Sequence, residues 1–206
     1  MISIFKKEEK TTREPEAFIF IGRSGAGKGT QAELLKEYLK KCDCTILHIE
    51  TGALLRELIK GQSYTEGLIR KTVNEGGLVP EPVAVNMWFS YLKETFTGKE
   101  DLLFDGSPRK IMEARLLDGM LTFYGFKHYK VIYLDVPTHE STKRLTTRGR
   151  KDDTTSGIEN RMKWFESEVL PCVEFFKTCD NAQLLDINGH QSIEAVHAEI
   201  VSKIGL

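Results

Sequence analysis

Five short apolar runs are spaced along the chain, and each predicts a β-strand. Several of them are apolar at nearly every position and are rich in Ile, Leu, Val and Phe. Strands of a parallel sheet have this pattern because helices cover both faces of the sheet. The runs are Ala17–Ile21, Thr45–Ile49, Asp101–Phe104, Lys130–Val136 and Gln183–Ile187.

Helical periodicity fills the intervals between these runs. Within Lys28–Lys41, apolar residues recur every three or four positions, which places them on one face of a helix. A longer apolar stripe extends from Ile158 to Phe176, and Ile193–Ile204 predicts a last helix with one apolar face. Strands that alternate with helices predict a doubly wound α/β domain around a five-stranded parallel sheet. No internal repeat or interdomain linker interrupts this order.

Two regions depart from the alternation. Thr51–Pro82 predicts a helical pair broken by glycines, and Gly149–Gly157 is a polar loop with the sequence GRKDDTTSG. Both follow the C-terminal ends of predicted strands or the helices that adjoin them, which is where α/β proteins bind ligands. We expect both regions to act as flaps over a binding site.

Composition and charge exclude several classes of function. The chain carries 29 Lys and Arg against 30 Asp and Glu, a formal net charge of -1, so no long-range field favours nucleic acid or an anionic membrane. No apolar run approaches the roughly 20 residues needed to cross a bilayer. Residues 1–16 are polar and lack a secretion signal, so we expect a loose tail whose Ile2, Ile4 and Phe5 could pack on the domain.

Four cysteines are best read as thiols. Cys42 and Cys44 form a C-D-C pair, which differs from the usual C-x₂₋₄-C spacing of metal sites, and no His lies at a matching interval. Buried or free thiols, including Cys172 and Cys179, fit a reducing compartment. The predicted location is therefore the cytoplasm.

The stretch GRSGAGKGT contains a phosphate-binding loop with the spacing G-x₄-G-K, formed by Gly22, Gly27 and Lys28. The loop directly follows a predicted strand and opens a predicted helix, which is the confirming context for this motif. Glycines let backbone N–H groups converge on phosphate oxygens, and the helix N-terminus adds positive dipole. Lys28 supplies a point charge for the β- and γ-phosphates of a nucleotide.

The hydroxyl of this loop is displaced by one position. Gly29 follows the lysine, where Ser or Thr is usual, and the hydroxyl comes at Thr30. A Thr at that position can bond an α-phosphate, whereas Mg²⁺ would be held mostly through water. A carboxylate must then lie near the metal's waters, and Asp105 is the candidate, because it ends a buried strand where packing alone poorly explains an Asp.

A set of arginines indicates phosphoryl transfer, a reaction that needs positioning and positive charge more than covalent help. A single arginine is more often a solvated surface residue. These arginines, however, lie near predicted strand ends or glycine hinges. They are Arg56, Arg109, Arg144, Arg148, Arg150 and Arg161.

With these motifs in view, the chain closely resembles the adenylate kinases and the wider nucleoside monophosphate kinase family, in its short-lid form. GRSGAGKGTQ is similar to G-x-P-G-x-G-K-G-T-Q, ETGALLREL to S-T-G-D-x-L-R, and DGSPRKIMEA to D-G-F-P-R-T-x-x-Q-A. TKRLTTRG with RKDD resembles the short lid, and DING resembles a loop that contacts the ATP adenine. The resemblance implies a single kinase domain over residues 17–206, with a monophosphate-binding insertion at about 51–82 and a lid at about 149–161.

The resemblance also implies a reaction, namely reversible Mg²⁺-dependent transfer of a phosphoryl group from ATP to AMP, giving two ADP. The enzyme would be a monomer that binds these nucleotides, and Asp105 would hold waters of the Mg²⁺ shell. The implied ATP-binding residues are Gly25, Ala26, Gly27, Lys28, Gly29, Thr30, Arg144, Arg148 and Gly189, with Arg144 stacked on the base. The implied monophosphate-binding residues are Thr51, Gly52, Arg56, Val79, Gly106, Arg109, Glu113, Arg150 and Arg161. The implied catalytic residues are Lys28, Arg109, Arg148, Arg150 and Arg161.

The chain departs from the family pattern at several positions. Ala53 stands where the family has Asp or Glu, which predicts weaker organisation of Mg²⁺. Ser107 replaces an aromatic residue and predicts looser packing beneath the monophosphate base. The segment between Arg148 and Arg150 is shorter than in typical short lids.

Glu113 leaves the identity of the acceptor open. It stands where adenylate kinases have a Gln that bonds the AMP base, and an ionised Glu accepts hydrogen bonds but cannot donate them. Thr51 favours AMP over the acceptors of UMP/CMP kinases. Two alternatives therefore remain: a kinase of CMP, UMP or a deoxynucleotide, and a non-catalytic nucleotide-binding protein.

Overall fold

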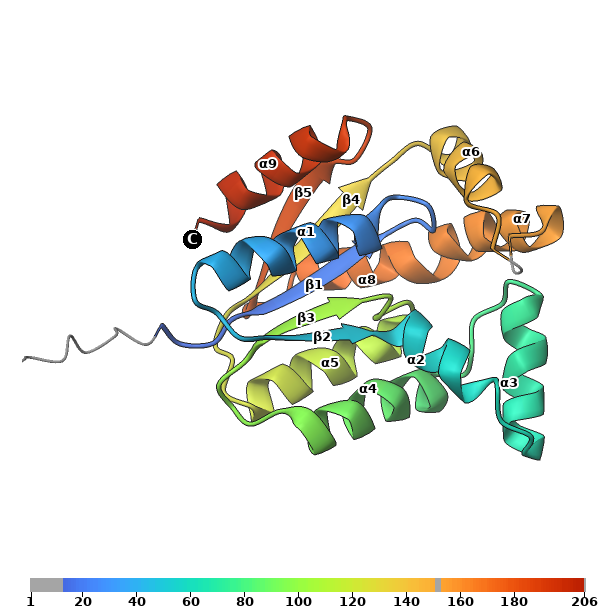
Figure 1. Ribbon diagram of the computed structural model, residues 1–206, viewed down its shortest axis with the longest axis horizontal. Coiled ribbons are helices and arrows are strands. Elements are labelled where there is room, and N and C mark those ends of the chain that lie inside the picture. The colour runs from blue at the N-terminus through green and yellow to red at the C-terminus, as the bar shows by residue number, and fades with distance from the viewer. Residues whose placement is uncertain (1–12, 151–152, 206) are drawn as a thin grey trace, which may run out of the picture.

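The computed structural model describes residues 13–150 and 153–205, and within them the chain forms a parallel sheet covered by helices (Figure 1). All strand pairs are parallel, in the order β2-β3-β1-β4-β5. The strands are β1 (Ala17–Gly22), β2 (Ile46–Glu50), β3 (Asp101–Asp105), β4 (Tyr129–Asp135) and β5 (Ala182–Asn188). The five predicted strands are confirmed to within one residue at each end, and so is the doubly wound fold class.

Alternate residues of β1 face two separate cores, as the two-residue period of a strand requires. Phe18 and Phe20 pack with residues of α1 (Lys28–Lys41) and α9 (Ile193–Ile204) on one face of the sheet. Ile19 and Ile21 pack against the other face, where the covering helices lie. These are α4 (Glu81–Thr95), α5 (Ile111–Phe123) and α8 (Leu170–Lys177).

The predicted helical pair after the second strand is present as α2 (Thr51–Leu58) and α3 (Tyr64–Asn74). A capping box between Ser63 and Glu66 starts α3. The pair has a small apolar core of its own, formed with the start of α4. The insertion projects from the sheet beside the carboxyl ends of the strands (Figure 1).

The polar loop and the helix after it differ from the prediction. The loop is shorter, because α6 (Thr138–Arg148) ends just before it and α7 (Thr155–Trp164) begins inside it, with Thr154 as the N-cap. The apolar stripe from Ile158 to Phe176 is interrupted by a π-helical turn, η1 (Phe165–Val169). Pro171 has no N–H to donate to the carbonyl four residues earlier, so the hydrogen-bond ladder must change there.

Residues 13–16 of the expected tail lie along the start of β3. The backbone N–H of Glu16 donates to Asp101 Oδ1 (2.8 Å), its carbonyl accepts from Leu102 N (2.9 Å), and Arg13 pairs with Asp101. The apolar residues Ile2, Ile4 and Phe5 lie outside the described residues. All four cysteines are free, as the sequence indicated.

Candidate active site

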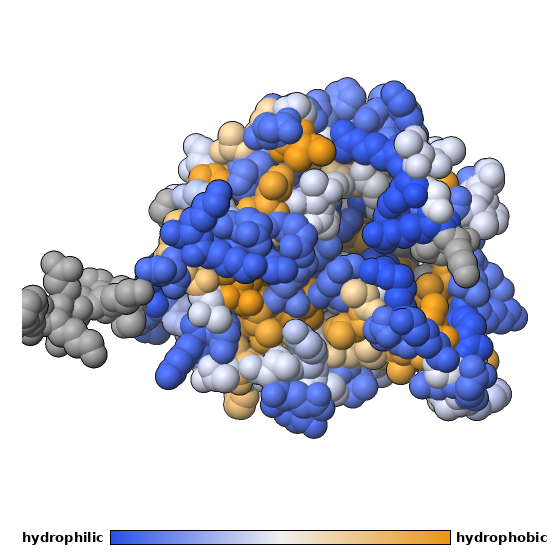
Figure 2. Space-filling view, in the orientation of Figure 1, coloured by the Kyte–Doolittle hydropathy of each residue, from blue (hydrophilic) through white to orange (hydrophobic). Residues whose placement is uncertain are grey.

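A cleft of about 1380 Å³ opens at the carboxyl ends of the strands, between the helical insertion and the α6–α7 region. Hydrophilic surface borders the hollow on this side of the molecule (Figure 2). Most of the predicted site residues line this one cleft, although they come from six separate parts of the sequence. Those that line it are Gly25, Gly27, Lys28, Gly29, Thr30, Thr51, Gly52, Arg56, Val79, Asp105, Gly106, Arg109, Glu113, Arg144, Arg148, Arg150 and Arg161.

The phosphate-binding loop joins β1 to α1 in a conformation that requires glycine. Gly25 has φ +84°, and a Cβ there would lie 2.6 Å from the Ser141 carbonyl oxygen. Gly27, with φ +96°, leads directly into the N-terminus of α1. Lys28 Nζ donates to the carbonyls of Gly22 (2.7 Å) and Arg23 (2.8 Å), and burial lowers the pKa of Lys28 to about 8. Converging N–H groups, a helix N-terminus and an ammonium group form an anion site.

Asp105 ends β3 directly beside this loop. A Cβ on Gly29 would lie 3.3 Å from Asp105 Oδ2, so the glycine after the lysine lets the carboxylate approach closely. Asp105 is buried and makes no hydrogen bond or ion pair with any other described residue. Burial raises its pKa, and the charge of Lys28 opposes that shift. A buried carboxylate without a donor suits the waters of a hydrated cation. Among the described residues, no three His, Cys, Asp or Glu side chains gather closely enough to bind a metal directly.

Two predicted ATP-binding residues, Ala26 and Gly189, do not line the cleft. They are buried, and their carbonyls accept from Arg144 at 3.5 and 3.2 Å, while Arg144 Nε donates to Glu140 (2.9 Å). Arg144 therefore ties the phosphate loop to the loop after β5. Gly189 itself packs tightly against Val136, with no room for a side chain.

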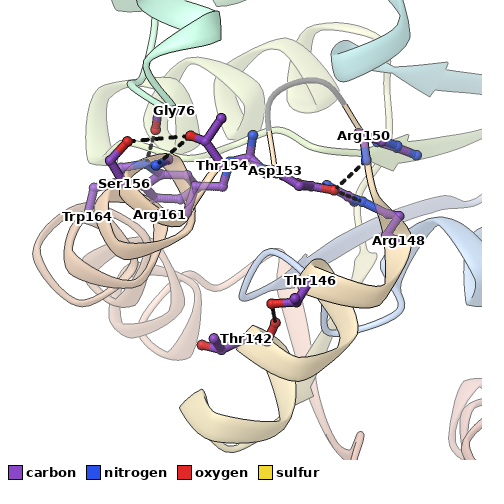
Figure 3. Close-up of polar contacts among 11 residues, drawn as sticks. Gly76, Thr142, Thr146, Arg148, Arg150, Asp153, Thr154, Ser156, Arg161 and Trp164 are labelled. Carbon is purple, nitrogen blue, oxygen red and sulfur yellow. Dashed lines mark hydrogen bonds and ion pairs between the residues drawn. The ribbon is translucent and has the colours of Figure 1, made fainter.

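One carboxylate that sequence reasoning did not single out, Asp153, accepts hydrogen bonds from the side chains of Arg148 and Arg161 and from the backbone N–H of Arg150 (Figure 3). Arg148 donates to it twice, at 2.9 and 2.8 Å, Arg161 donates at 2.7 Å, and the backbone N–H of Arg150 donates at 3.1 Å. Burial of Asp153 favours its neutral form, but the hydrogen bonds from Arg148 and Arg161 outweigh burial and lower its pKa to about 2. The carboxylate holds the arginines at the edge of the cleft.

The substitution Asp153→Asn tests this cluster through stability. The native pKa of about 2 lies below the roughly 3.9 of an unfolded Asp. The charged form therefore stabilises the fold above about pH 4, and this contribution is lost as pH falls towards 2. We expect the variant to lose on the order of 2 kcal/mol at about pH 7 and clearly less at about pH 3, in denaturant unfolding. The exposed Asp186→Asn serves as control. A deficit that is the same at both pH values would contradict this account.

Arg109 and Glu113 form the floor of the cleft on the side of the insertion. The backbone N–H of Arg109 donates to Glu113 Oε2 (2.9 Å), and its guanidinium lies 5.6 Å from the centre of the Trp164 ring. Burial lowers the pKa of Arg109, opposed by the charge of Glu113, and burial raises the pKa of Glu113, opposed by Arg109. Trp164 Nε1 donates to the Gly76 carbonyl (2.9 Å), which joins α7 to the insertion.

Several buried polar atoms along the cleft have no partner within the described part of the chain. They are His48 Nε2, Thr51 Oγ1 and Ser107 Oγ, and all three residues line the cleft. Buried polar atoms in folded proteins are nearly always hydrogen-bonded, so water or a polar ligand would satisfy these atoms.

The cleft-lining residues that sequence reasoning missed include Glu33, His48, Glu50 and Trp164. A signal existed for two of them, because His48 and Glu50 are polar residues at alternate positions of an otherwise apolar strand. Trp164 gave no comparable signal, since an aromatic residue in an apolar stripe is usually part of the core.

Comparisons with known proteins agree with this geometry. A family model described as "Adenylate kinase" matches residues 20–181. The chain is 36% identical over 187 residues to "Adenylate kinase 1" of Nostoc sp., covering 91% of this chain and 97% of that protein. It is 34% identical over 190 residues to "Adenylate kinase" of Leptospira biflexa, covering 90% and 98%. It is 37% identical over 163 residues to "Adenylate kinase" of Porphyromonas gingivalis, covering 77% and 80%.

Proposed function

The chain belongs to the adenylate kinase family, and on that premise we propose how its own residues transfer a phosphoryl group from ATP to AMP. It is an ATP-dependent nucleoside monophosphate kinase, whose reaction is reversible and gives two ADP. The observation that carries the residue roles is the convergence of Lys28, Asp105, Arg109 and the lid arginines on one cleft.

On the donor side, the loop from Gly25 to Thr30 cradles the ATP phosphates with its backbone N–H groups. Lys28 exchanges its contacts with the Gly22 and Arg23 carbonyls for the β- and γ-phosphates. Arg144 contacts both the phosphate loop and the loop after β5, and in this proposal the adenine binds beside its guanidinium. Mg²⁺ is a normal partner of ATP in this family, and when bound it neutralises charge on the phosphates. Asp105 would hold its waters.

On the acceptor side, Arg56 and Arg109 bind the phosphate of the monophosphate. Both line the cleft next to Gly52, Gly106 and Thr51, whose hydroxyl has no partner among the described residues. Glu113 lines the same side of the cleft and is buried, and in this proposal it would contact the base.

Transfer itself depends on charge and alignment. Arg148, Arg150 and Arg161 bring positive charge from the lid to the phosphoryl group as it moves between the two nucleotides. Asp153 keeps Arg148 and Arg161 together before substrate binds. The acceptor is an ionised phosphate, so no general base is needed. The complete set of charges and the family membership favour catalysis over the non-catalytic alternative.

A monomer in the cytoplasm is the arrangement we propose for the enzyme. The cleft is built from a single chain, and four free thiols suit a reducing compartment. None of the helices in the described part of the chain is long and apolar enough to cross a membrane.

The substitution Glu113→Gln tests how the acceptor base is recognised. The amide oxygen can still accept from the Arg109 N–H, and the new amide N–H₂ can donate to adenine. One net hydrogen bond of about 1 kcal/mol predicts a rise of about fivefold in the ratio of kcat/KM for AMP to kcat/KM for CMP. A coupled assay over AMP, CMP, UMP and dAMP measures this ratio, with the exposed Glu94→Gln as control. A ratio that stays the same or falls would show that Glu113 does not contact the base.

A further inference from the structure

Glu50 ends β2 directly opposite Asp105, which ends β3, in the parallel register of the two strands. Adjacent strands lie about 4.8 Å apart, and residues in register project to the same face of a sheet. Asp105 faces α1, since its Oδ2 lies next to Gly29. The side chains of Glu50 and Asp105 therefore leave the same face of the sheet from neighbouring positions.

The neighbours of Glu50 support this direction. His48, two positions earlier on the same face of β2, contacts Glu33 of α1 through Nδ1 at 3.1 Å. Glu50, His48 and Asp105 all line the cleft beside Gly29. Thr51, the next residue, is 2% exposed, and its hydroxyl has no partner among the described residues. Thr51 Oγ1 and His48 Nε2 are therefore two further buried polar atoms next to these carboxylates that water or a polar ligand would satisfy.

The two carboxylates repel each other. Burial is the largest cause of the raised pKa of Asp105, and the negative charge of the neighbouring Glu50 raises this pKa further. A hydrated divalent cation near both groups would relieve this repulsion. Mg²⁺ keeps several of its waters in proteins, so it needs carboxylates at the distance of its water shell rather than a direct set of ligands.

Glu50 is held away from such a cation by Arg56. Glu50 Oε1 accepts from Arg56 Nη2 at 2.6 Å, and the two side chains are 39% and 43% exposed. A solvent-exposed ion pair of this kind is weak and exchanges readily. The phosphate of a monophosphate carries more charge and can accept two parallel hydrogen bonds from one guanidinium, so it competes well for Arg56.

We propose that monophosphate binding takes Arg56 from Glu50, and that the freed carboxylate joins Asp105 in holding the water shell of the Mg²⁺ that accompanies ATP. This inference rests on the proposed function, because it places the metal near Asp105 and the monophosphate at Arg56. Glu50 would thereby supply the second carboxylate that Ala53 cannot. Binding of the monophosphate then strengthens binding of the metal, and by linkage the metal strengthens binding of the monophosphate.

Mn²⁺, a paramagnetic substitute for Mg²⁺, reports this coupling through water-proton relaxation. It is titrated into the full-length enzyme saturated with a non-hydrolysable ATP analogue, with and without saturating AMP. The wild type should bind Mn²⁺ about fivefold more tightly with AMP. Glu50→Gln should lose this increase and keep the affinity measured without AMP. Glu57→Gln is the matched control, since Glu57 lies on α2, the helix that directly follows Glu50, pairs with Lys60 and does not line the cleft.

A wild type that shows no response to AMP would overturn the proposal, and so would a Glu50→Gln variant that keeps the full response. Asp105→Asn separates this failure from a failure of the proposed function. If Asp105→Asn weakens Mn²⁺ binding while Glu50→Gln behaves as the wild type, only the role of Glu50 is wrong. If Asp105→Asn changes nothing, the metal does not lie near Asp105, and the inference fails with it.

Discussion

Replacing Lys28 with Ala is expected to lower kcat/KM for ADP formation by about 10³-fold or more. Lys28 carries the only ammonium group that the described structure places within hydrogen-bond distance of the loop carbonyls of Gly22 and Arg23. In the proposed function its charge meets the β- and γ-phosphates, where negative charge shifts during transfer. Loss of this group removes both ground-state attraction and transition-state stabilisation, so kcat should fall and KM for ATP should rise.

Lys40→Ala is the control for this substitution. Lys40 lies on the same helix, is half exposed and pairs with Glu37 away from the cleft. It should keep wild-type kinetics. Thermal unfolding of both variants checks that the fold is intact. A Lys28→Ala enzyme with activity within about tenfold of the wild type would show that the loop works without its lysine.

Replacing Arg109 with Ala is expected to lower kcat/KM for AMP by about 10³-fold. This is the lower end of the rate contribution of arginines that stabilise the transition state of phosphoryl transfer. The Arg109 guanidinium lies over Trp164, on the acceptor side of the cleft, and the charges of Glu113 and Asp105 stabilise it. The backbone N–H that holds Glu113 is unchanged by the substitution. Affinity for a non-hydrolysable ATP analogue should therefore stay within about twofold of the wild type.

The decisive comparison for Arg109→Ala is between its effect on kcat/KM for AMP and its effect on affinity for the ATP analogue. Steady-state kinetics give kcat/KM for AMP, and calorimetry gives the affinity for the ATP analogue. Arg115→Ala, an exposed position on α5, the helix that follows Arg109, is the control. An equal loss for both nucleotides would mean that Arg109 serves the donor as much as the acceptor.

The strands and the phosphate loop could be predicted from the sequence because their signals are local. A strand buried on both faces, such as Phe18–Ile21, must be apolar at each position, and no tertiary contact changes that. The glycines of the loop likewise follow from the backbone conformation that a phosphate site requires. The displaced hydroxyl now has a structural reason, since Gly29 makes room for Asp105.

The features that sequence reasoning missed depend on which charges meet in space. Six arginines were identified, but nothing local shows that Asp153 holds Arg148 and Arg161 together. Glu50 at a strand end gave no sign of its register with Asp105. Pro171 is a local sign of the π-helical turn between α7 and α8, but the apolar stripe continues through this turn and predicts one uninterrupted helix.

The path of the γ-phosphoryl group shows directly whether this cleft transfers it from ATP to AMP. ATP radiolabelled in the γ-phosphate is incubated with AMP, Mg²⁺ and the enzyme, and the products are separated at early times. We expect label in the β-phosphate of ADP made from AMP, with two ADP formed for each ATP consumed. Label released as inorganic phosphate, or ATP consumed equally fast without AMP, would contradict it.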